Sequence, residues 1–219
     1  MGLNYNRILL LDTKEFLPKQ TLRIELKKQR ESLDNITVRN LSNHIIANIQ
    51  KLLIDLNLLI IHNNHFFSYS PYNNEVDLNA LNELIIKSCG CVYLPVMNEN
   101  SIEFYKQKNL DNFTKNKYGI KEPCKTEQFS KIEFEQLKNR IVMLCPGIAF
   151  DKKMRRLGFG MGCYDSYLKK YAPENFIKIG VAYSFALVDT LPRGEYDIDM
   201  DYVVTEKEIW NSSGKLYTT

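Results

Sequence analysis

The chain has 219 residues, of which 44% are hydrophobic and 25% charged, and its formal net charge is +3. This length and composition fit one soluble globular domain spanning residues 1–219 better than two independent domains. The small net charge argues against nucleic acid as the main partner, although a local cluster of Lys and Arg can still bind a small anionic ligand.

The cysteines and the hydropathy pattern bear on the compartment. The cysteines are odd in number, form no C-x-x-C pair and are not extended by histidines into a zinc pattern; they are Cys89, Cys91, Cys124, Cys145 and Cys163. We interpret them as reduced thiols in an intracellular compartment. No run reaches the roughly 18 apolar residues of a membrane-spanning helix, and no signal or transit peptide is recognised. We therefore expect no membrane association and a cytoplasmic location, with mitochondria left open.

Two amphipathic helices are predicted at the N-terminal end. Pro18 opens a segment in which Leu22 and Leu26 lie four residues apart among basic neighbours, which is typical of a helix that begins at a proline. A second helix is predicted from about Val38 to Leu56, because its apolar residues recur on one side.

The next segments predict strands around one further helix. Short apolar stretches at 58–61 and 66–70 indicate a strand or strand pair. Asp77 is suited to cap a helix through Ile85, and Gly90 to end it in the left-handed conformation. Residues 91–95 predict a strand closed by Pro95, and residues 102–105 another strand. The polar segment 107–135 is expected to be a long loop.

The C-terminal half predicts an α/β fold. Residues 141–145 form a continuous apolar run typical of a buried strand, followed by a glycine-rich loop and an amphipathic helix at about 163–171. Two further buried strands are predicted at 177–183 and 202–204. Strands alternating with helices favour a three-layer domain with a mainly parallel sheet flanked by helices. Ligands in such folds bind at the carboxyl ends of the strands, where the glycine-rich loop lies.

The glycine-rich loop has three glycines at alternate positions, Gly158, Gly160 and Gly162. Such a loop leading into a helix can expose N–H groups to an anion. Arg156 offers a planar fork for phosphate oxygens, and Asp165 is placed to hold Mg²⁺. The same spacing fits a tight strand-to-helix turn equally well. The loop is neither a Walker A motif nor G-x-G-x-x-G.

Longer motifs resemble those of a known family. The segment from Cys145 to Asp151, C-P-G-I-A-F-D, followed by R-L-G-F-G-M-G-C-Y-D from Arg156 to Asp165, is similar to the signature of 5-formyltetrahydrofolate cyclo-ligases. That family reads P-G-x-x-F-D and then R-L-G-x-G-x-G-Y-Y-D. Four further segments agree in chain order, and the resemblance covers about residues 18–206. They are K-x-x-L-R with Lys19 and Arg23, E-V-D from Glu75, Y-G-I-x-E-P at 118–123, and D-Y-V-V-T-E from Asp201.

The resemblance implies an enzyme that uses ATP and Mg²⁺ to convert 5-formyltetrahydrofolate, with or without a polyglutamate tail, to 5,10-methenyltetrahydrofolate. It implies a monomer or weak oligomer, with Arg156 as the catalytic residue and Asp165 and Asp201 as metal ligands. Glu75, Ser70 and Tyr164 are the implied substrate-binding residues. The implied ATP-binding residues are Lys19, Arg23, Arg156, Leu157, Gly158, Phe159, Gly160, Met161, Gly162, Cys163 and Tyr164.

Several positions depart from the family pattern. Cys163 replaces the first tyrosine of Y-Y-D, Met161 stands where the family has Gly or Lys, and Tyr196 stands where many members have His. The contacts implied at 161 and 163 are affected most. A nucleophilic role for Cys163 is not favoured, because no histidine is near it in sequence.

Structural roles remain open for several of these residues. Lys19 and Arg23 can form a solvated helix face, Asp201 can simply begin a strand, and Tyr69 and Phe67 can be core residues rather than a stacking surface. Two other functions stay open: a non-catalytic folate- or nucleotide-binding protein, and a sugar-phosphate isomerase on a similar fold that binds phosphate without using ATP.

Overall fold

The computed structural model describes residues 18–58, 64–99, 101–116, 119–129, 141–171, 174 and 176–218. Four α-helices lie within these ranges, α1 (Lys19–Glu31), α2 (Asn35–Asp55), α3 (Asn79–Cys89) and α5 (Cys163–Lys170). The central sheet has the strand order β14-β13-β12-β10-β7-β1-β2-β3-β6. Its strands are β1 (His65–Phe67), β2 (Val92–Asn98), β3 (Ser101–Gln107), β6 (Glu127–Gln128), β7 (Ile141–Pro146), β10 (Phe176–Val181), β12 (Tyr202–Val204), β13 (Glu208–Asn211) and β14 (Gly214–Thr218).

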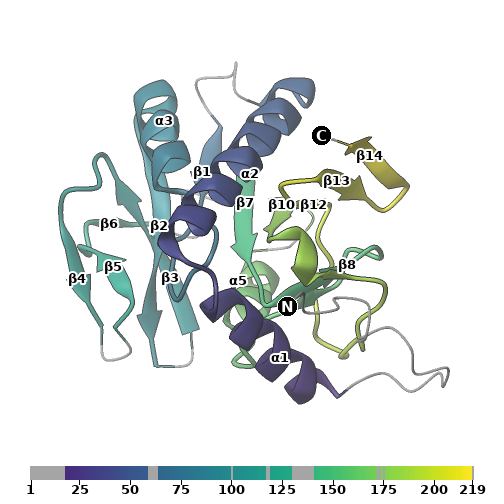
Figure 1. Cartoon of the computed structure of the whole chain (residues 1–219). Coiled ribbons are helices and arrows are strands. Elements are labelled where there is room, and N and C mark those ends of the chain that lie inside the picture. The colour runs from purple at the N-terminus through teal and green to yellow at the C-terminus, as the bar shows by residue number, and fades with distance from the viewer. Residues whose placement is uncertain are drawn as a thin grey trace, which may run out of the picture.

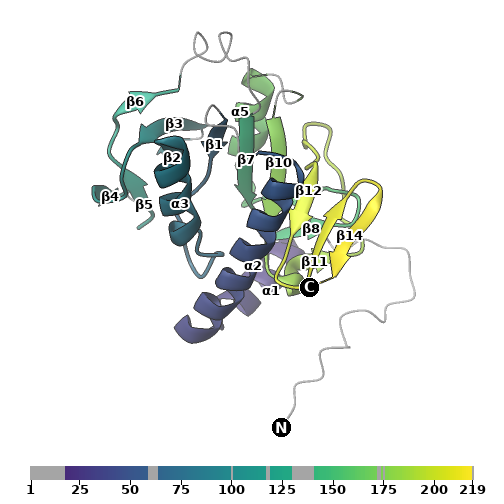
Figure 2. The same cartoon turned by 90° about the horizontal axis from the view of Figure 1, so that it is seen from above.

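The middle of this sheet is parallel, as predicted. The pairs β1–β2, β1–β7, β7–β10 and β10–β12 are all parallel. Antiparallel strands extend the sheet at both edges. Figures 1 and 2 show α2 and α3 on one side of the sheet and α5 on the other. The expected three-layer α/β architecture is therefore confirmed.

Strand β7 shows why the sheet is covered on both faces. Val142 and Leu144 pack into the core that contains the apolar sides of α2 and α3. Met143 and Cys145 pack into a second core with the α5 residue Leu168. Because successive side chains of a strand point to opposite faces, a continuous apolar run is what a doubly covered strand requires.

The predicted helices form, with local signals at their ends. Pro18 is the N-cap of α1 rather than its first residue. Asp34 caps α2 by accepting a hydrogen bond of 2.8 Å from the Thr37 N–H. Asp77 accepts a bond of 2.9 Å from the Asn79 N–H at the start of α3, and Gly90 ends that helix with φ of 84°.

Two predictions in the middle of the chain were wrong. Strand β2 continues through Pro95 to Asn98. The Met97 N–H donates to the Glu122 side chain rather than to β3. The backbone nitrogen of Pro95 points the same way as that of Met97, so the proline removes no hydrogen bond between β2 and β3. The expected loop at 107–135 contains β6 and the hairpin of β4 (Phe113–Lys115) with β5 (Lys121–Pro123). Of the strand predicted at 58–61, residues 59–61 lie outside the described residues.

A small three-stranded sheet carries the chain from β7 to the glycine-rich loop. It pairs β8 (Ala149–Asp151) with β9 (Arg156–Leu157) and β11 (Leu187–Val188). The Phe150 ring packs over Gly147 and Gly180, where an added Cβ would lie 2.6 and 2.4 Å from ring atoms. The buried Asp151 carboxylate binds Arg155 Nε at 2.6 Å and the Leu191 N–H at 2.8 Å. This packing places the loop beyond the carboxyl end of β7.

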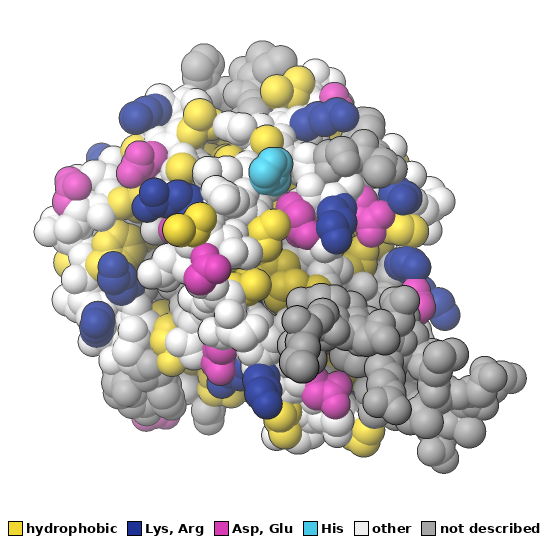
Figure 3. Space-filling view, viewed as in Figure 1, with side chains coloured by type: hydrophobic (Ala, Val, Ile, Leu, Met, Phe, Trp, Pro, Cys, Tyr) yellow, Lys and Arg dark blue, Asp and Glu magenta, His cyan; other side chains and the backbone are white. Residues whose placement is uncertain are grey.

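Among the described residues, the charged side chains on one face of the molecule form no large patch of one sign (Figure 3). Basic and acidic side chains are intermixed on the face shown in Figure 3, which agrees with the small net charge. None of the described helices is both long and apolar enough to span a membrane.

Candidate active site

A cavity of about 520 Å³ opens at the carboxyl end of β7, between α1, the glycine-rich loop and the segment after β1. This volume lies within the range of roughly 300–1,000 Å³ typical of small-molecule sites. Its lining includes every predicted site residue except Asp201: Lys19, Arg23, Ser70, Glu75, Arg156, Leu157, Gly158, Phe159, Gly160, Met161, Gly162, Cys163, Tyr164 and Asp165.

Helix α1 contributes its basic side to this cavity. Arg23 Nε donates a hydrogen bond of 2.9 Å to the Gly158 carbonyl oxygen, so the helix is fastened to the glycine-rich loop. Gly160 and Gly162 have φ of 111° and 64°, conformations that favour glycine. Lys19 and Arg23 are therefore part of a cavity wall.

Two ion pairs lie side by side in the cavity. Arg156 Nη2 is 2.8 Å from Asp165 Oδ2, and Lys19 Nζ is 2.6 Å from Asp197 Oδ2. The Ile198 N–H donates to Asp165 Oδ1 at 3.1 Å, which brings the 197–198 peptide against Asp165. Burial alone would raise the pKa of Asp197, but the hydrogen bonds from Lys19 and the Gly194 N–H, with Lys19 and Arg156 nearby, lower it.

The structure does not bring Asp201 to these groups. Asp201 precedes β12, and its carboxylate binds Lys178 Nζ at 2.8 Å and the Lys178 N–H at 2.7 Å. Because the register aligns Tyr202 with Ile179, Asp201 lies level with the middle of β10 rather than at the carboxyl-end edge of the sheet. Asp201 therefore does not line the cavity, whereas Asp197 lines it beside Asp165.

The cavity wall also contains a buried carboxylate. Glu75 is 7% exposed and accepts a hydrogen bond of 3.1 Å from the Tyr72 N–H. Burial raises the pKa of Glu75 to about 7 despite the nearby Arg30. Close by, the Ser70 hydroxyl is buried without a hydrogen-bond partner among the described residues. A carboxylate and a free hydroxyl can together recognise the N–H and carbonyl groups of a heterocyclic ligand.

The residues that depart from the family pattern have distinct surroundings. Cys163 is buried at the start of α5, and burial raises its pKa, so it is not set up as a nucleophile. Phe159 and Met161 are among the most exposed large apolar side chains of the described residues, and both line the cavity. Phe67 lies in the core, whereas Tyr69 is buried and also forms part of the cavity wall.

Sequence reasoning missed two carboxylates of the cavity. Asp197 lies in the run D-I-D-M-D, in which three aspartates alternate and spacing alone cannot select one. Glu122 belongs to the Y-G-I-x-E-P motif but was given no role. It accepts bonds of 2.8 Å from the Met97 N–H and from Asn116 Nδ2.

Comparison with known proteins identifies the family of the chain. The sequence model of the 5-formyltetrahydrofolate cyclo-ligase family matches residues 17–206. The chain is 30% identical to the 5-formyltetrahydrofolate cyclo-ligase of Escherichia coli over 148 residues, which cover 65% of this chain and 78% of that protein. It is 25% identical to the enzyme of the same name from Haemophilus influenzae over 185 residues, covering 83% and 94% of the two chains.

Solved structures share the fold. The NMR structure of 5,10-methenyltetrahydrofolate synthetase from Aquifex aeolicus matches with a TM-score of 0.73 at 30% identity, covering 93% of this chain and 97% of that one. A 5,10-methenyltetrahydrofolate synthetase from Mycoplasma pneumoniae matches with a TM-score of 0.65 at 26% identity, covering 87% and 100%. The fold and the family expected from the motifs are both confirmed, and the chain belongs to the 5-formyltetrahydrofolate cyclo-ligase family.

Proposed function

We propose that this protein catalyses the ATP- and Mg²⁺-dependent conversion of 5-formyltetrahydrofolate to 5,10-methenyltetrahydrofolate, with release of ADP and phosphate. The observation that carries this proposal is that one cavity is lined both by a cationic loop and by a buried carboxylate. In the proposed complex a phosphate donor binds the cations and a heterocyclic acceptor binds the carboxylate. Membership of the family supports the same substrate.

The cationic end suits a triphosphate. Lys19, Arg23 and Arg156 surround the glycine-rich loop, and Arg156 and Lys19 are neutralised by Asp165 and Asp197. When ATP binds, the cations would pair with phosphate oxygens, and Asp165 and Asp197 would be free to hold its metal ion. Such an exchange of partners keeps each charge compensated in a partly buried site.

The two carboxylates fit Mg²⁺. This ion prefers hard oxygen ligands and is commonly bound by one or two protein carboxylates together with substrate phosphates and water. Among the described residues no three potential ligands cluster, which suits an ion that arrives with phosphate rather than one held by protein alone. Asp165 and Asp197 would hold it, and it would supply Lewis-acid stabilisation of the phosphate charge.

The chemistry then requires alignment more than a protein nucleophile. The formyl oxygen attacks the γ-phosphorus, ADP leaves, and the formyl carbon becomes electrophilic as an imidoyl phosphate. N10 attacks that carbon, loses its proton, and the bond from carbon to the phosphate oxygen breaks as the ring closes. Glu75 and Ser70 orient the pterin, while Arg156 stabilises charge on the transferring phosphoryl group.

The test is to mix purified protein with 5-formyltetrahydrofolate, Mg²⁺ and ATP and to follow the absorbance of the methenyl product. We expect a rise that requires both ATP and Mg²⁺, with one ADP formed per methenyl group. Saturable binding of folate and ATP by folded protein without turnover would instead support a non-catalytic binding protein. Phosphate binding without ATP use would support an isomerase.

A further inference from the structure

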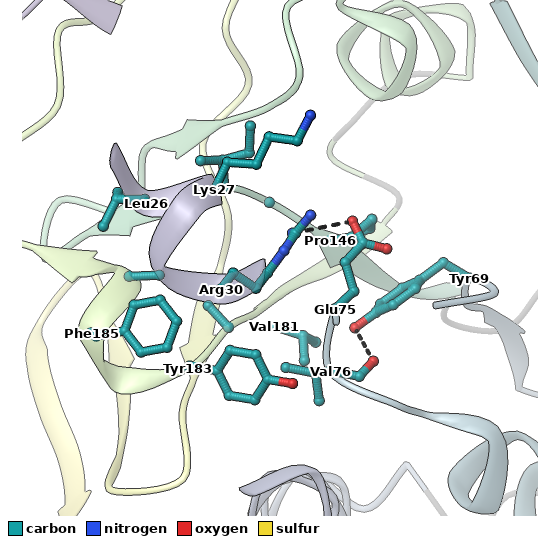
Figure 4. Close-up of a pocket in the computed structure, with 14 residues that line it drawn as sticks. Leu26, Lys27, Arg30, Tyr69, Glu75, Val76, Pro146, Val181, Tyr183 and Phe185 are labelled. Carbon is teal, nitrogen blue, oxygen red and sulfur yellow. Dashed lines mark hydrogen bonds and ion pairs between the residues drawn. The ribbon is translucent and has the colours of Figure 1, made fainter. Parts of the chain in front are cut away.

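The buried carboxylate of the cavity wall is paired with a cation to which the motifs assign no role. Arg30, on the last turn of α1, places Nη1 3.5 Å from Glu75 Oε1, and the two side chains are 7% and 8% exposed. Figure 4 shows Arg30 reaching from α1 toward the Glu75 carboxylate, with Tyr69 next to Glu75. The pair lies in a recess that shares Glu75 and Tyr69 with the main cavity.

The guanidinium depends on Glu75 for its compensation. Arg30 Nε and Nη2 are buried without a hydrogen-bond partner among the described residues. The Phe159 ring of the glycine-rich loop lies 5.5 Å from Arg30 Cζ and covers the cation from that side. A buried cation with one carboxylate partner interacts strongly with that partner, because little water is present to screen the two charges.

The pair still leaves Glu75 able to bind a ligand. Its two oxygens accept one bond each, from Arg30 at 3.5 Å and from the Tyr72 N–H at 3.1 Å. An ionised carboxylate offers about four acceptor sites, whereas a protonated one carries an O–H that opposes an incoming N–H. Binding of the N–H groups of a pterin therefore requires Glu75 to be ionised and held in place.

We propose that Arg30 is a positioning residue for the proposed reaction: its buried guanidinium favours the ionised form of the Glu75 carboxylate and fixes it on the cavity wall, where the carboxylate accepts the pterin N–H groups. This inference rests on the proposed function for the identity of the ligand. Arg30 itself touches no reacting atom.

The other groups around Glu75 do not replace Arg30. Tyr69, Tyr164 and Tyr183 interact electrostatically with Glu75, and burial raises the pKa of all three, so they stay neutral at physiological pH. Tyr72 contributes its backbone N–H. Lys27, on α1, also lines the recess, but among the causes that shift the pKa of Glu75 the cation is Arg30, whose charge lowers it against the larger effect of burial.

The experiment compares the full chain with Arg30→Met, which removes the charge, and Arg30→Lys, which keeps it. The control is Lys178→Met, because Lys178 is also a buried cation paired with a carboxylate, 2.8 Å from Asp201, but lines neither cavity. The first readout is the pH titration of the Glu75 carboxyl carbon by NMR in the free protein, assigned by its loss in Glu75→Gln. The second is the pH dependence of KM for 5-formyltetrahydrofolate.

We expect Arg30→Met to move the titration of Glu75 upward by about one pH unit or more, the scale of an opposite charge at close range. KM for 5-formyltetrahydrofolate rises as Glu75 becomes protonated at low pH, and this rise should begin at a correspondingly higher pH in Arg30→Met. At alkaline pH, kcat should change less than KM. Arg30→Lys should keep the Glu75 titration and the pH profile of KM close to those of the parent protein. Lys178→Met should leave both unchanged. If Arg30→Met does not fold, a smaller upward displacement in Arg30→Lys gives the same test.

An unchanged Glu75 titration in both Arg30 variants, with normal turnover by the parent protein, would overturn this inference alone. A displaced titration in a parent protein that forms no methenyl product would contradict the proposed function alone, because the titration needs no substrate. Equal losses of kcat in Arg30→Met and Lys178→Met, with no displacement of either profile, would reduce Arg30 to a purely structural residue.

Discussion

At the scale of single residues, the run D-I-D-M-D contains both Asp197, the carboxylate that we propose holds the metal, and Asp201. Asp197 and Asp201 differ by four positions, yet Asp197 lies in the cavity with Asp165 and Asp201 pairs with Lys178. We predict that Asp165→Asn and Asp197→Asn each raise the Mg²⁺ concentration for half-maximal activity at least tenfold, on a scale of roughly 10–100-fold. Asp201→Asn is the matched control. A larger effect of Asp201→Asn than of Asp197→Asn would reverse this assignment.

Arg156 is the cation closest to the proposed chemistry. Its side chain is 6% exposed, contacts Asp165 and lies over the Tyr164 ring with Cζ 5.3 Å from the centroid. We predict that Arg156→Ala lowers kcat/KM by the equivalent of about 2–4 kcal/mol, as expected for loss of a preorganised donor. Arg155→Ala is the control, because Arg155 binds Asp151 outside the cavity. Near-normal kcat/KM in Arg156→Ala would remove Arg156 from the mechanism.

Glu75 gives a prediction on stability. Because its pKa rises from an ordinary 4.5 to about 7 in the folded protein, the folded state binds more protons than the unfolded state between these values. The contribution of Glu75 to the free energy of unfolding is therefore fully present below pH 4.5 and is lost as the pH rises through 7. The loss amounts to up to about 3 kcal/mol. Urea unfolding across this range should show the loss in the parent protein and in Glu83→Gln on the exposed side of α3. The same slope in Glu75→Gln would show that another group is responsible.

At the scale of elements, the contact of Phe150 with two glycines explains how β7 and β10 present the loop. An added Cβ at Gly180 would lie 2.4 Å from Phe150 Cε1. We predict that Gly180→Ala destabilises the protein by about 1–3 kcal/mol, the usual cost of overpacking, measured from urea midpoints. Adding Phe150→Leu should recover part of the loss, since the smaller side chain gives way. Unchanged stability in Gly180→Ala would mean that Phe150 is not held against this strand.

The elements predicted correctly are those with strong local signals. Helices α1 and α2 have apolar residues at helical spacing, and β7 is a continuous apolar run. The segments β4, β5 and β6 are two or three residues long, and few of their residues are buried, so they carry no pattern that distinguishes them from loop. The strand was predicted to end at Pro95, but a strand can contain a proline where its backbone nitrogen does not face a neighbouring strand. Which side of β2 has a neighbour at that position is a tertiary property that the sequence does not show.

At the scale of the whole molecule, the site joins segments that are distant in the chain. The hydrogen bond from Arg23 to Gly158 spans 135 positions, and the contact of Arg30 with Glu75 spans 45. Motif resemblance predicted most of the cavity wall, because the motifs preserve residues that act together. It could not predict Asp197 or Arg30, since their roles depend on the position of the 197–198 peptide and on the depth of the last turn of α1.

In the proposed reaction, one cavity aligns the formyl oxygen of the folate with the γ-phosphorus of ATP. This alignment is tested by supplying 5-formyltetrahydrofolate labelled with ¹⁸O in the formyl group and analysing the released phosphate by mass spectrometry. We expect one ¹⁸O atom in each phosphate formed with methenyl product. Unlabelled phosphate accompanying ring closure would contradict it, because the formyl oxygen would then have left without being phosphorylated.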